Sequence, residues 1–400
     1  MSGTGLLRAP HVPRLLGGSL VGRLPAAMAT VAIPLTLRGT GAGYGFVGLA
    51  AGLFALATAL GGPLLGRLVD RVGQSPVLLP AAVGHGVGLV AVALAPTRPA
   101  VVLLGALLAG ASSPPLEPCL RALWPDVVGE EALEAAYSLD SASQELVFIG
   151  APLVVSACAA VGSPRAALAV GALLGLAGVL TMASAPPARR WQSPPRAPDP
   201  LGPLRSPGLV ILLVSLTGVG TALGVLNVFA VSYAEGHRMP GGAPTLLALN
   251  AGGALIGGVA YGAWAGRWTA SPVRRSILLT AGLAVAYGFL CLTPAPPFMA
   301  ALMLLTGLFL SPVLAAGFVL VGSLAPTGTS TEAFAWLVTL MNAGVAVGAA
   351  LVGALLQRTT LPWAASCGAI GAAAGLAVLL LGRRRLRRPA PVGPRPVQRV

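Results

Sequence analysis

The sequence is short of charge. Aspartate, glutamate, lysine and arginine make up 9% of its 400 residues, whereas apolar side chains make up 56% and the mean hydropathy is +0.85. Charge-free runs longer than the ~18 residues that mark a membrane-spanning helix recur along the chain. A soluble domain cannot bury so much apolar surface, so we expect a polytopic integral membrane protein.

Several functional classes lack their sequence signals. Lysine is absent, and the net charge of +14 comes from arginines in a chain rich in alanine, glycine and proline, so we expect no nucleic-acid partner. The four cysteines stand one at a time in apolar runs, without the paired spacing of a metal or redox site. The chain has no GxxxxGK[ST], HExxH or GxSxG motif, so we expect neither an enzyme nor a bound cofactor. Any step that needs energy would then draw on an ion gradient or on the gradient of another solute.

Breaks at charges, prolines and glycines divide the chain into about twelve spans. The predicted fold is therefore all-α and polytopic. The expected spans are roughly 14 to 37, 42 to 65, 76 to 95, 99 to 120, 133 to 160, 165 to 185, 208 to 233, 243 to 266, 276 to 293, 297 to 322, 332 to 356 and 361 to 382.

The arginines predict the orientation of these spans. With the N-terminus in the cytoplasm, 19 arginines fall in inner loops and tails and five in outer loops, which the positive-inside rule favours. We therefore expect both termini to be cytoplasmic, in a bacterial inner membrane. The first apolar segment is too long for a cleavable signal, so we expect it to be the first span.

The chain divides into two similar halves. Residues 186–207, PPARRWQSPPRAPDPLGPLRSP, predict a cytoplasmic linker between six-helix bundles at 1–185 and 208–382, with a basic cytoplasmic tail at 383–400. GPLLGR at 62–67 recurs as GAWAGR at an offset of 200, and the Ser-Pro and Glu-Ala pairs of the first half recur at an offset of 198. Two parallel repeats around an axis along the membrane normal would enclose a substrate site and alternate its access.

The stretch GRLVDRVGQSPVL, residues 66–78, resembles the signature GxLxDRxG of the major facilitator superfamily, in the loop between its second and third spans. Gly66, Leu68, Asp70, Arg71 and Gly73 match it, whereas glutamine and serine replace the basic pair that usually follows. The resemblance covers nearly the whole chain and is closest to twelve-span bacterial members of the drug/proton antiporter type.

The resemblance implies a gate. It places Asp70 at the positive N-terminal end of span eleven, where Thr329 and Glu332 have capping-box spacing. Because Glu332 would already occupy that dipole, Arg67 or Arg71 should lie alongside Asp70. The implied contact is a latch that holds the two halves together in the outward-facing state. Alternatively, the two arginines are only positive-inside markers. The second copy has no aspartate, which suggests an asymmetric latch.

Charges inside the membrane are functional candidates because they are costly there. Arg23 lies in the middle of the first span and should have a buried acid as its partner. Glu145 in the fifth span, on one helical face with Glu134, is the candidate partner, whereas Asp140 points elsewhere and is only a second candidate for a proton carrier. Such a pair is either a static ion pair that sets helix register or a group that binds and releases a proton.

Other polar residues in the spans have two possible roles each. Glu117 and Arg121, beside three prolines in the fourth span, form either an inner gate or a simple pair. Asn227, Asn250 and Asn342 either face a central cavity and bind substrate or make interhelical hydrogen bonds.

The sequence as a whole predicts a secondary active transporter in the lipid bilayer. It should act as a monomer that moves a small amphiphilic molecule by alternating access, coupled to a proton or another ion. Export is favoured by GAPLVV at 150–155, which faintly resembles an antiporter motif of the fifth span. The alternatives are an importer of a sugar or metabolite, and a non-transporting sensor or assembly protein on the same scaffold.

Overall fold

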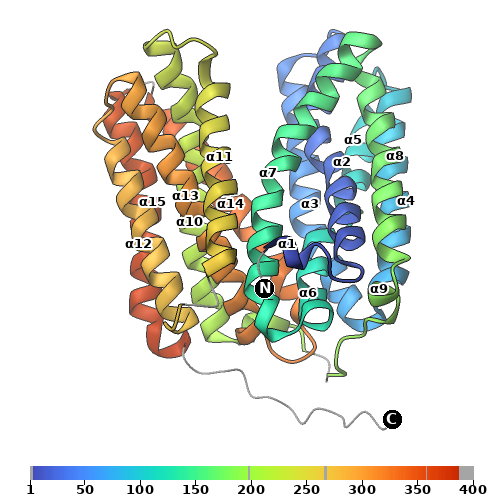
Figure 1. The fold of residues 1–400 in the computed structure, drawn as a ribbon. Coiled ribbons are helices and arrows are strands. Elements are labelled where there is room, and N and C mark those ends of the chain that lie inside the picture. The colour runs from blue at the N-terminus through green and yellow to red at the C-terminus, as the bar shows by residue number, and fades with distance from the viewer. Residues whose placement is uncertain (1–2, 197–198, 265–267, 357, 387–400) are drawn as a thin grey trace.

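A computed structural model describes residues 3–196, 199–264, 268–356 and 358–386. Its regular elements in these ranges are all helices (Figure 1). They are α1 (Gly3–Leu6), α2 (Val12–Gly39), α3 (Tyr44–Val72), α4 (Gln74–Leu94), α5 (Pro99–Ala111), α6 (Leu116–Val128), α7 (Glu130–Val161), α8 (Pro164–Ala183), α9 (Pro186–Arg190), the 3-10 helix η1 (Gly202–Arg205), α10 (Pro207–Gly236), α11 (Gly242–Trp264), α12 (Pro272–Leu290), α13 (Pro296–Leu324), α14 (Ser330–Leu356) and α15 (Leu361–Leu386).

Twelve of the described spans are long and apolar enough to cross a membrane, with α5 and α6 together forming the fourth. The predicted all-α fold with twelve spans is confirmed. Many spans begin at a proline, which needs no hydrogen-bond partner for a backbone N–H in the first turn. Two of these starts are also capped by serine: Ser206 accepts from the N–H of Leu209, and Ser271 accepts from the N–H of Arg274.

The helices form two bundles, α2–α8 and α10–α15 (Figure 1). Within each bundle, glycines allow backbones to touch. A Cβ atom on Gly178 of α8 would lie 2.2 Å from the backbone nitrogen of Gly22 in α2, and one on Gly224 of α10 would lie 2.0 Å from the carbonyl oxygen of Val345 in α14. Small residues at such contacts are the usual means of close packing between membrane helices.

Within the part of the chain that the structure describes, the two bundles meet at one end. We call this the lower end, since it lies at the bottom of Figure 1, where the segment between α8 and α10 also runs. In the described residues, every hydrogen bond and ion pair between the bundles lies in the lower halves of their helices. Toward the upper end the ribbons of α7 and α11 diverge (Figure 1).

Helix α3 is longer than the apolar run that predicts it. The sequence suggested a span ending near residue 65 and a loop carrying the charged motif, but α3 continues to Val72 and only Gly73 separates it from α4. Arginine and aspartate are compatible with a helix at the membrane surface, so the charges do not end it. The turn depends on Gly73, whose φ of 94° favours glycine.

Candidate functional site

Four charged side chains of the first bundle form a closed ring. Arg23 of α2 contacts Glu117 of α6 at 2.9 Å and Asp140 of α7 at 3.4 Å. Arg121 of α6 pairs with the same two carboxylates, through Nε at 2.8 Å to Asp140 and through Nη2 to Glu117. We call these four residues the charge ring. Its two arginines and two carboxylates balance, so it carries no net charge when all four are ionised.

A break in the fourth span positions half of this ring. The chain leaves the helix between Ala111 and Leu116, in the sequence SSPP, and α6 restarts with Glu117 in its first turn. Arg121 follows one turn later on the same face. The side chains of Arg121 and Asp140 are fully buried, whereas those of Arg23 and Glu117 are 10% and 13% exposed. The charge ring is therefore accessible only from the side of Arg23 and Glu117.

The charge ring also touches the second bundle. The guanidinium of Arg121 lies over the ring of Phe318 in α13, 3.5 Å from its centroid. Tyr137 of α7 packs edge-on against the same phenylalanine, and its hydroxyl donates to the backbone oxygen of Arg121. A cation over an aromatic face is attracted by the ring quadrupole. The position of Arg121 thus depends on both bundles.

The expected partner of Arg23 was wrong. Arg23 contacts Asp140 and Glu117, while Glu145 is half-buried and makes no ion pair in the described part of the chain. Asp140 and Glu145 are five positions apart, which places them about 140° apart around a helix. Glu134 lies on the face of α7 that turns to the second bundle, and Asp140 lies on the face that turns to α2.

At the lower end, Asp70 caps α14. Its two carboxylate oxygens accept from the backbone N–H groups of Thr331, at 3.0 Å, and Glu332, at 2.9 Å. Arg67, one turn before Asp70, pairs with Glu332 at 2.7 Å, and Arg71 is exposed. Asp70 thus lies at the N-terminal end of α14 with an arginine beside it, as expected. That arginine is Arg67. We call Arg67, Asp70 and Glu332 the lower latch.

The expected capping box of α14 is not formed. The hydroxyl of Thr329 donates to the backbone oxygen of Pro326, and Asp70 from α3 takes the first-turn N–H groups instead. Gly66 permits this approach, because a Cβ there would lie 3.1 Å from the Cα of Glu332. The carboxylate of Asp70, which comes from the other bundle, therefore caps α14 in place of a side chain next to that helix in the sequence.

The two residues that replace the usual basic pair have structural partners. Gln74 is buried and donates to the backbone oxygen of Cys119 in α6 at 2.9 Å, and Ser75 donates to that of Ala183 at the end of α8. These bonds tie the start of α4 to its own bundle. Nothing in the sequence around Gln74 indicated these partners, because both acceptors are backbone atoms far along the chain.

A second contact between the bundles surrounds Glu134 near the start of α7. Its carboxylate pairs with Arg275 of α12 and accepts from the hydroxyl of Tyr261 in α11. The sequence repeat relates Glu134 to Glu332, and each acid indeed binds an arginine of the opposite bundle. Arg275 is one of the 19 arginines that the sequence assigns to inner loops and tails, and nothing else in the sequence singled it out. Arg267 of the repeated GAWAGR lies outside the described residues. We call this the Glu134 cluster.

Comparison with known proteins decides the family. The sequence profile of the Major Facilitator Superfamily matches residues 15–273, which is more than half of the chain. The chain belongs to the Major Facilitator Superfamily. It is thus a multi-pass membrane protein and a secondary transporter, as predicted, and not an enzyme. No match was found among curated protein sequences.

Solved structures of other transporters share the fold. A bacterial homologue of the iron transporter ferroportin, in an outward-facing state, superposes with a TM-score of 0.76 at 16% identity, covering 93% of this chain and 99% of that one. The outward conformation of the transporter FucP gives 0.71 at 16% identity, with coverages of 94% and 98%. The human organic anion transporter MFSD10 gives 0.66 at 16% identity, with coverages of 95% and 100%.

The three candidate asparagines differ in this major facilitator chain. Asn250 of α11 is buried and donates to the hydroxyl of Thr306, at 2.9 Å, and to the backbone oxygen of Met303 in α13. It holds two helices of the same bundle together, so the interhelical alternative applies to it. Asn227 of α10 and Asn342 of α14 are exposed. Only these two stay available to a ligand.

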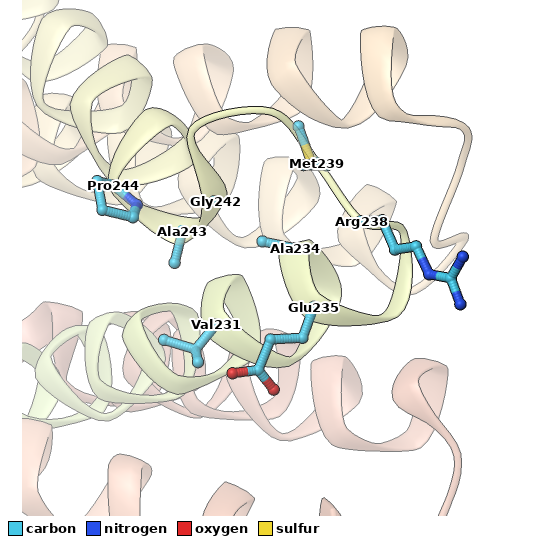
Figure 2. Close-up of a pocket in the computed structure, with 8 residues that line it drawn as sticks. All are labelled: Val231, Ala234, Glu235, Arg238, Met239, Gly242, Ala243 and Pro244. Carbon is cyan, nitrogen blue, oxygen red and sulfur yellow. The ribbon is translucent and has the colours of Figure 1, made fainter.

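A pocket of about 440 Å³ lies at the upper end, where α10 ends and α11 begins. Figure 2 shows Val231 and Glu235 on the last turns of α10, with Arg238 pointing away from Glu235. Sequence reasoning gave these residues no role. None of the residues that line it belongs to the charge ring or the lower latch, so the pocket is a separate feature of the upper surface.

Proposed function

We propose that the protein is a proton-coupled transporter that exports a small amphiphilic molecule, with the charge ring as the coupling site. One observation carries this proposal. The ring joins a partly exposed corner, Arg23 and Glu117, to the contact between Arg121 and Phe318 of the other bundle. A proton that enters at the exposed corner and is taken up within the ring therefore acts on a contact that differs between the two states of a transporter.

The coupling step follows from charge balance. With both carboxylates ionised, each arginine has two acidic partners and the ring is neutral. Addition of one proton to Asp140 removes a partner from both Arg23 and Arg121 and leaves one positive charge in excess. An excess buried charge is unfavourable, which favours movement of Arg121 away from Phe318. Release of the proton restores the neutral ring.

The rocking bodies in this proposal are residues 1–185 and 208–382, joined by the linker 186–207. The 19 arginines of the inner loops and tails support a cytoplasmic lower end and a bacterial inner membrane, with both termini in the cytoplasm. The contacts between bundles at the lower end, together with the diverging upper ends, then correspond to an outward-facing state. Asn227 and Asn342 are the proposed substrate contacts, and the protein acts as a monomer.

The proposed direction of transport, export, is supported by two residues of one sequence motif. Gly150 and Pro152 are what this chain keeps of the fifth-span antiporter motif. FucP is described as a fucose:proton symporter, and its similarity to this chain extends to the fold alone. Import of a sugar or metabolite is therefore the second candidate, and it differs from export only in the direction of the proton-driven flux.

Liposomes with an imposed pH gradient test the proposal. We expect the purified protein to accumulate or expel members of a panel of fluorescent amphiphilic compounds, with proton movement followed by a pH dye. Asp140→Asn should abolish gradient-driven flux and keep gradient-free exchange, because the ring can no longer change its charge there. Glu117→Gln should also reduce gradient-driven flux. Because the side chain of Glu117 is partly exposed, this change leaves no completely buried polar group without a partner.

Glu145→Gln is the matched control, because Glu145 lies on the same helix outside the ring. Gradient-driven flux that survives in Asp140→Asn and is lost in Glu145→Gln would move the coupling site to Glu145. Flux without proton movement in the unmodified protein would contradict proton coupling. No flux of any compound would favour a non-transporting role.

A further inference from the structure

The segment between α8 and α10 crosses the lower latch. We call residues 191–206 the connecting segment; residues 197–198 lie outside the described part. Its Arg196 contacts Oε2 of Glu332 at 3.2 Å, while Arg67 of α3 contacts Oε1 at 2.7 Å. The side chain of Glu332 is 1% exposed, so these two arginines enclose it. One partner comes from the first bundle and the other from the connecting segment.

The backbone of the connecting segment also lies close to Arg67 and Glu332. Arg67 also donates to the backbone oxygen of Pro200 at 2.7 Å. Gly202 has a φ of 53°, and a Cβ atom there would lie 2.9 Å from both carboxylate oxygens of Glu332. A side chain at position 202 would therefore displace the carboxylate or be displaced by it. The segment is built to pass directly under this acid.

The connecting segment also contacts both helix ends that the latch joins. A Cβ on Gly73, between α3 and α4, would lie 3.3 Å from the backbone oxygen of Trp191. A Cβ on Gly328, just before α14, would lie 2.6 Å from the backbone oxygen of Pro194 and 3.3 Å from Arg196. Both glycines have positive φ values, of 94° and 79°. The segment thus bridges the first bundle and α14 beside the pair of Arg67 and Glu332.

We propose that Arg196 is a positioning residue of the latch and that the connecting segment forms its third component. Arg67 alone balances Glu332, but both oxygens of a buried carboxylate need partners. Arg196 supplies the second one from a segment that is attached to both bundles. Separation of α14 from α3 then requires the segment to leave Glu332 or Gly73, so opening of the lower end is linked to displacement of the segment.

This inference rests on the proposed alternation between two states and is independent of proton coupling. Its test therefore needs neither a substrate nor a pH gradient. Nitroxide labels at Val161 and Pro240, two exposed positions at the upper ends of the two bundles, report the state through their distance distribution. The labelled protein carries serine at the half-buried Cys158, Cys291 and Cys367, with the buried Cys119 retained.

We expect the distances of the parent to be long, and Arg196→Gln to move at least half of the population to shorter ones. Loss of Arg196 weakens the lower contact and favours the state with a closed upper end. Arg196→Lys should restore most of the long-distance population, which a general packing defect would not do. Arg205→Gln is the matched control, because Arg205 is 69% exposed and pairs only with Asp199 within the described segment.

Arg67→Gln serves as the reference for latch loss. An unchanged distribution in Arg196→Gln, with or without a shift in Arg67→Gln, overturns the proposal. A separate measurement uses trypsin, which cleaves after arginine. Glu332→Gln should increase cleavage after Arg196 several-fold relative to cleavage after Arg205 in the same sample, and an unchanged ratio would also overturn it.

Discussion

The fourth and tenth spans occupy corresponding places in the two halves but differ in their course. The fourth is interrupted between α5 and α6, whereas α13 runs without interruption from Pro296 to Leu324. At the offset of 198, the sequence SSPPLEPC of the fourth span aligns with LSPVLAAG of α13. Both contain a Ser-Pro pair, so this pair alone does not break a helix.

The second proline is the difference. Pro115 stands where α13 has Val313, and a proline restricts the residue before it to extended conformations. Pro114 is that residue, and the helix resumes only at Leu116. Pro312 in α13 is followed by valine and is accommodated inside the helix.

The interrupted span carries ionic side chains, and the uninterrupted span has apolar ones at the aligned positions. Glu117 and Arg121 come directly after the break, and the aligned positions of α13 are Ala315 and Val319. The fourth span is thus irregular and carries ionic side chains, whereas α13 is a regular apolar span that supplies Phe318 as a contact surface. Within this pair of corresponding spans, the first half carries the buried charges and the second half supplies the packing surface.

The largest expected effect is a difference in stability between matched substitutions in the fourth and tenth spans. Arg121→Met should lower the free energy of unfolding by about 3–5 kcal/mol, because Glu117 and Asp140 then share one arginine in a buried site. Val319→Met, the aligned change in α13, should cost less than about 1.5 kcal/mol. Thermal unfolding in detergent measures both. The double variant Glu117→Gln, Arg121→Met should recover most of the loss, and equal losses in the two single variants would contradict the ionic role of the ring.

The next effect tests the break itself. Pro115→Val gives the fourth span the Ser-Pro-Val sequence of α13, and we expect a continuous helix that turns Glu117 away from Arg23. Gradient-driven flux should fall at least tenfold, about 1.4 kcal/mol in the rate-limiting step, with little loss of thermal stability. Pro118→Ala, which removes a proline after the break, is the control. Full activity of Pro115→Val would show that the break does not position the charge ring.

The smallest effect compares the two acids at the lower end. Tyr261→Phe removes one hydrogen bond to Glu134 and leaves its ion pair with Arg275, so it should cost about 0.5–1.5 kcal/mol. Asp70→Asn weakens the cap of two N–H groups and should favour the state with a closed upper end more strongly. The nitroxide distances described above measure both shifts. A larger shift for Tyr261→Phe would make the Glu134 cluster the main lower contact.

Much of the fold was predictable because the chain is so sparing with charge. Long apolar runs predict twelve spans, most of whose ends agree with the helices to within a few residues, and the family resemblance of the motif around Asp70 pointed to the N-terminal end of span eleven. The end of α3 was missed, because hydropathy falls at Arg67 while helical geometry does not change there. The static or coupling role of the buried charges stays a prediction.

The site was harder to predict because its contacts depend on breaks and on distant backbone. The pairing of Glu117 with Arg23 follows from the interruption before Leu116, and no periodicity carries across such a break. Helical periodicity alone separates Asp140 from Glu145 but does not say which face meets α2. Arg196 lies in a proline-rich segment without pattern, so its contact with Glu332 had no signal in the sequence.

The glycine contact between α2 and α8 limits how Arg23 can move. Gly22 precedes Arg23, and a Cβ on Gly22 would lie 2.4 Å from a methyl carbon of Leu116 and 3.4 Å from the backbone of Gly178. The backbone that carries Arg23 is therefore held in place, and Arg23 can change partners only by rotating its side chain. Side-chain rotations are faster than the microsecond-to-millisecond motion of whole domains. We therefore expect any change of partner in the charge ring to be a side-chain movement against a fixed backbone, separate from the rearrangement of the bundles.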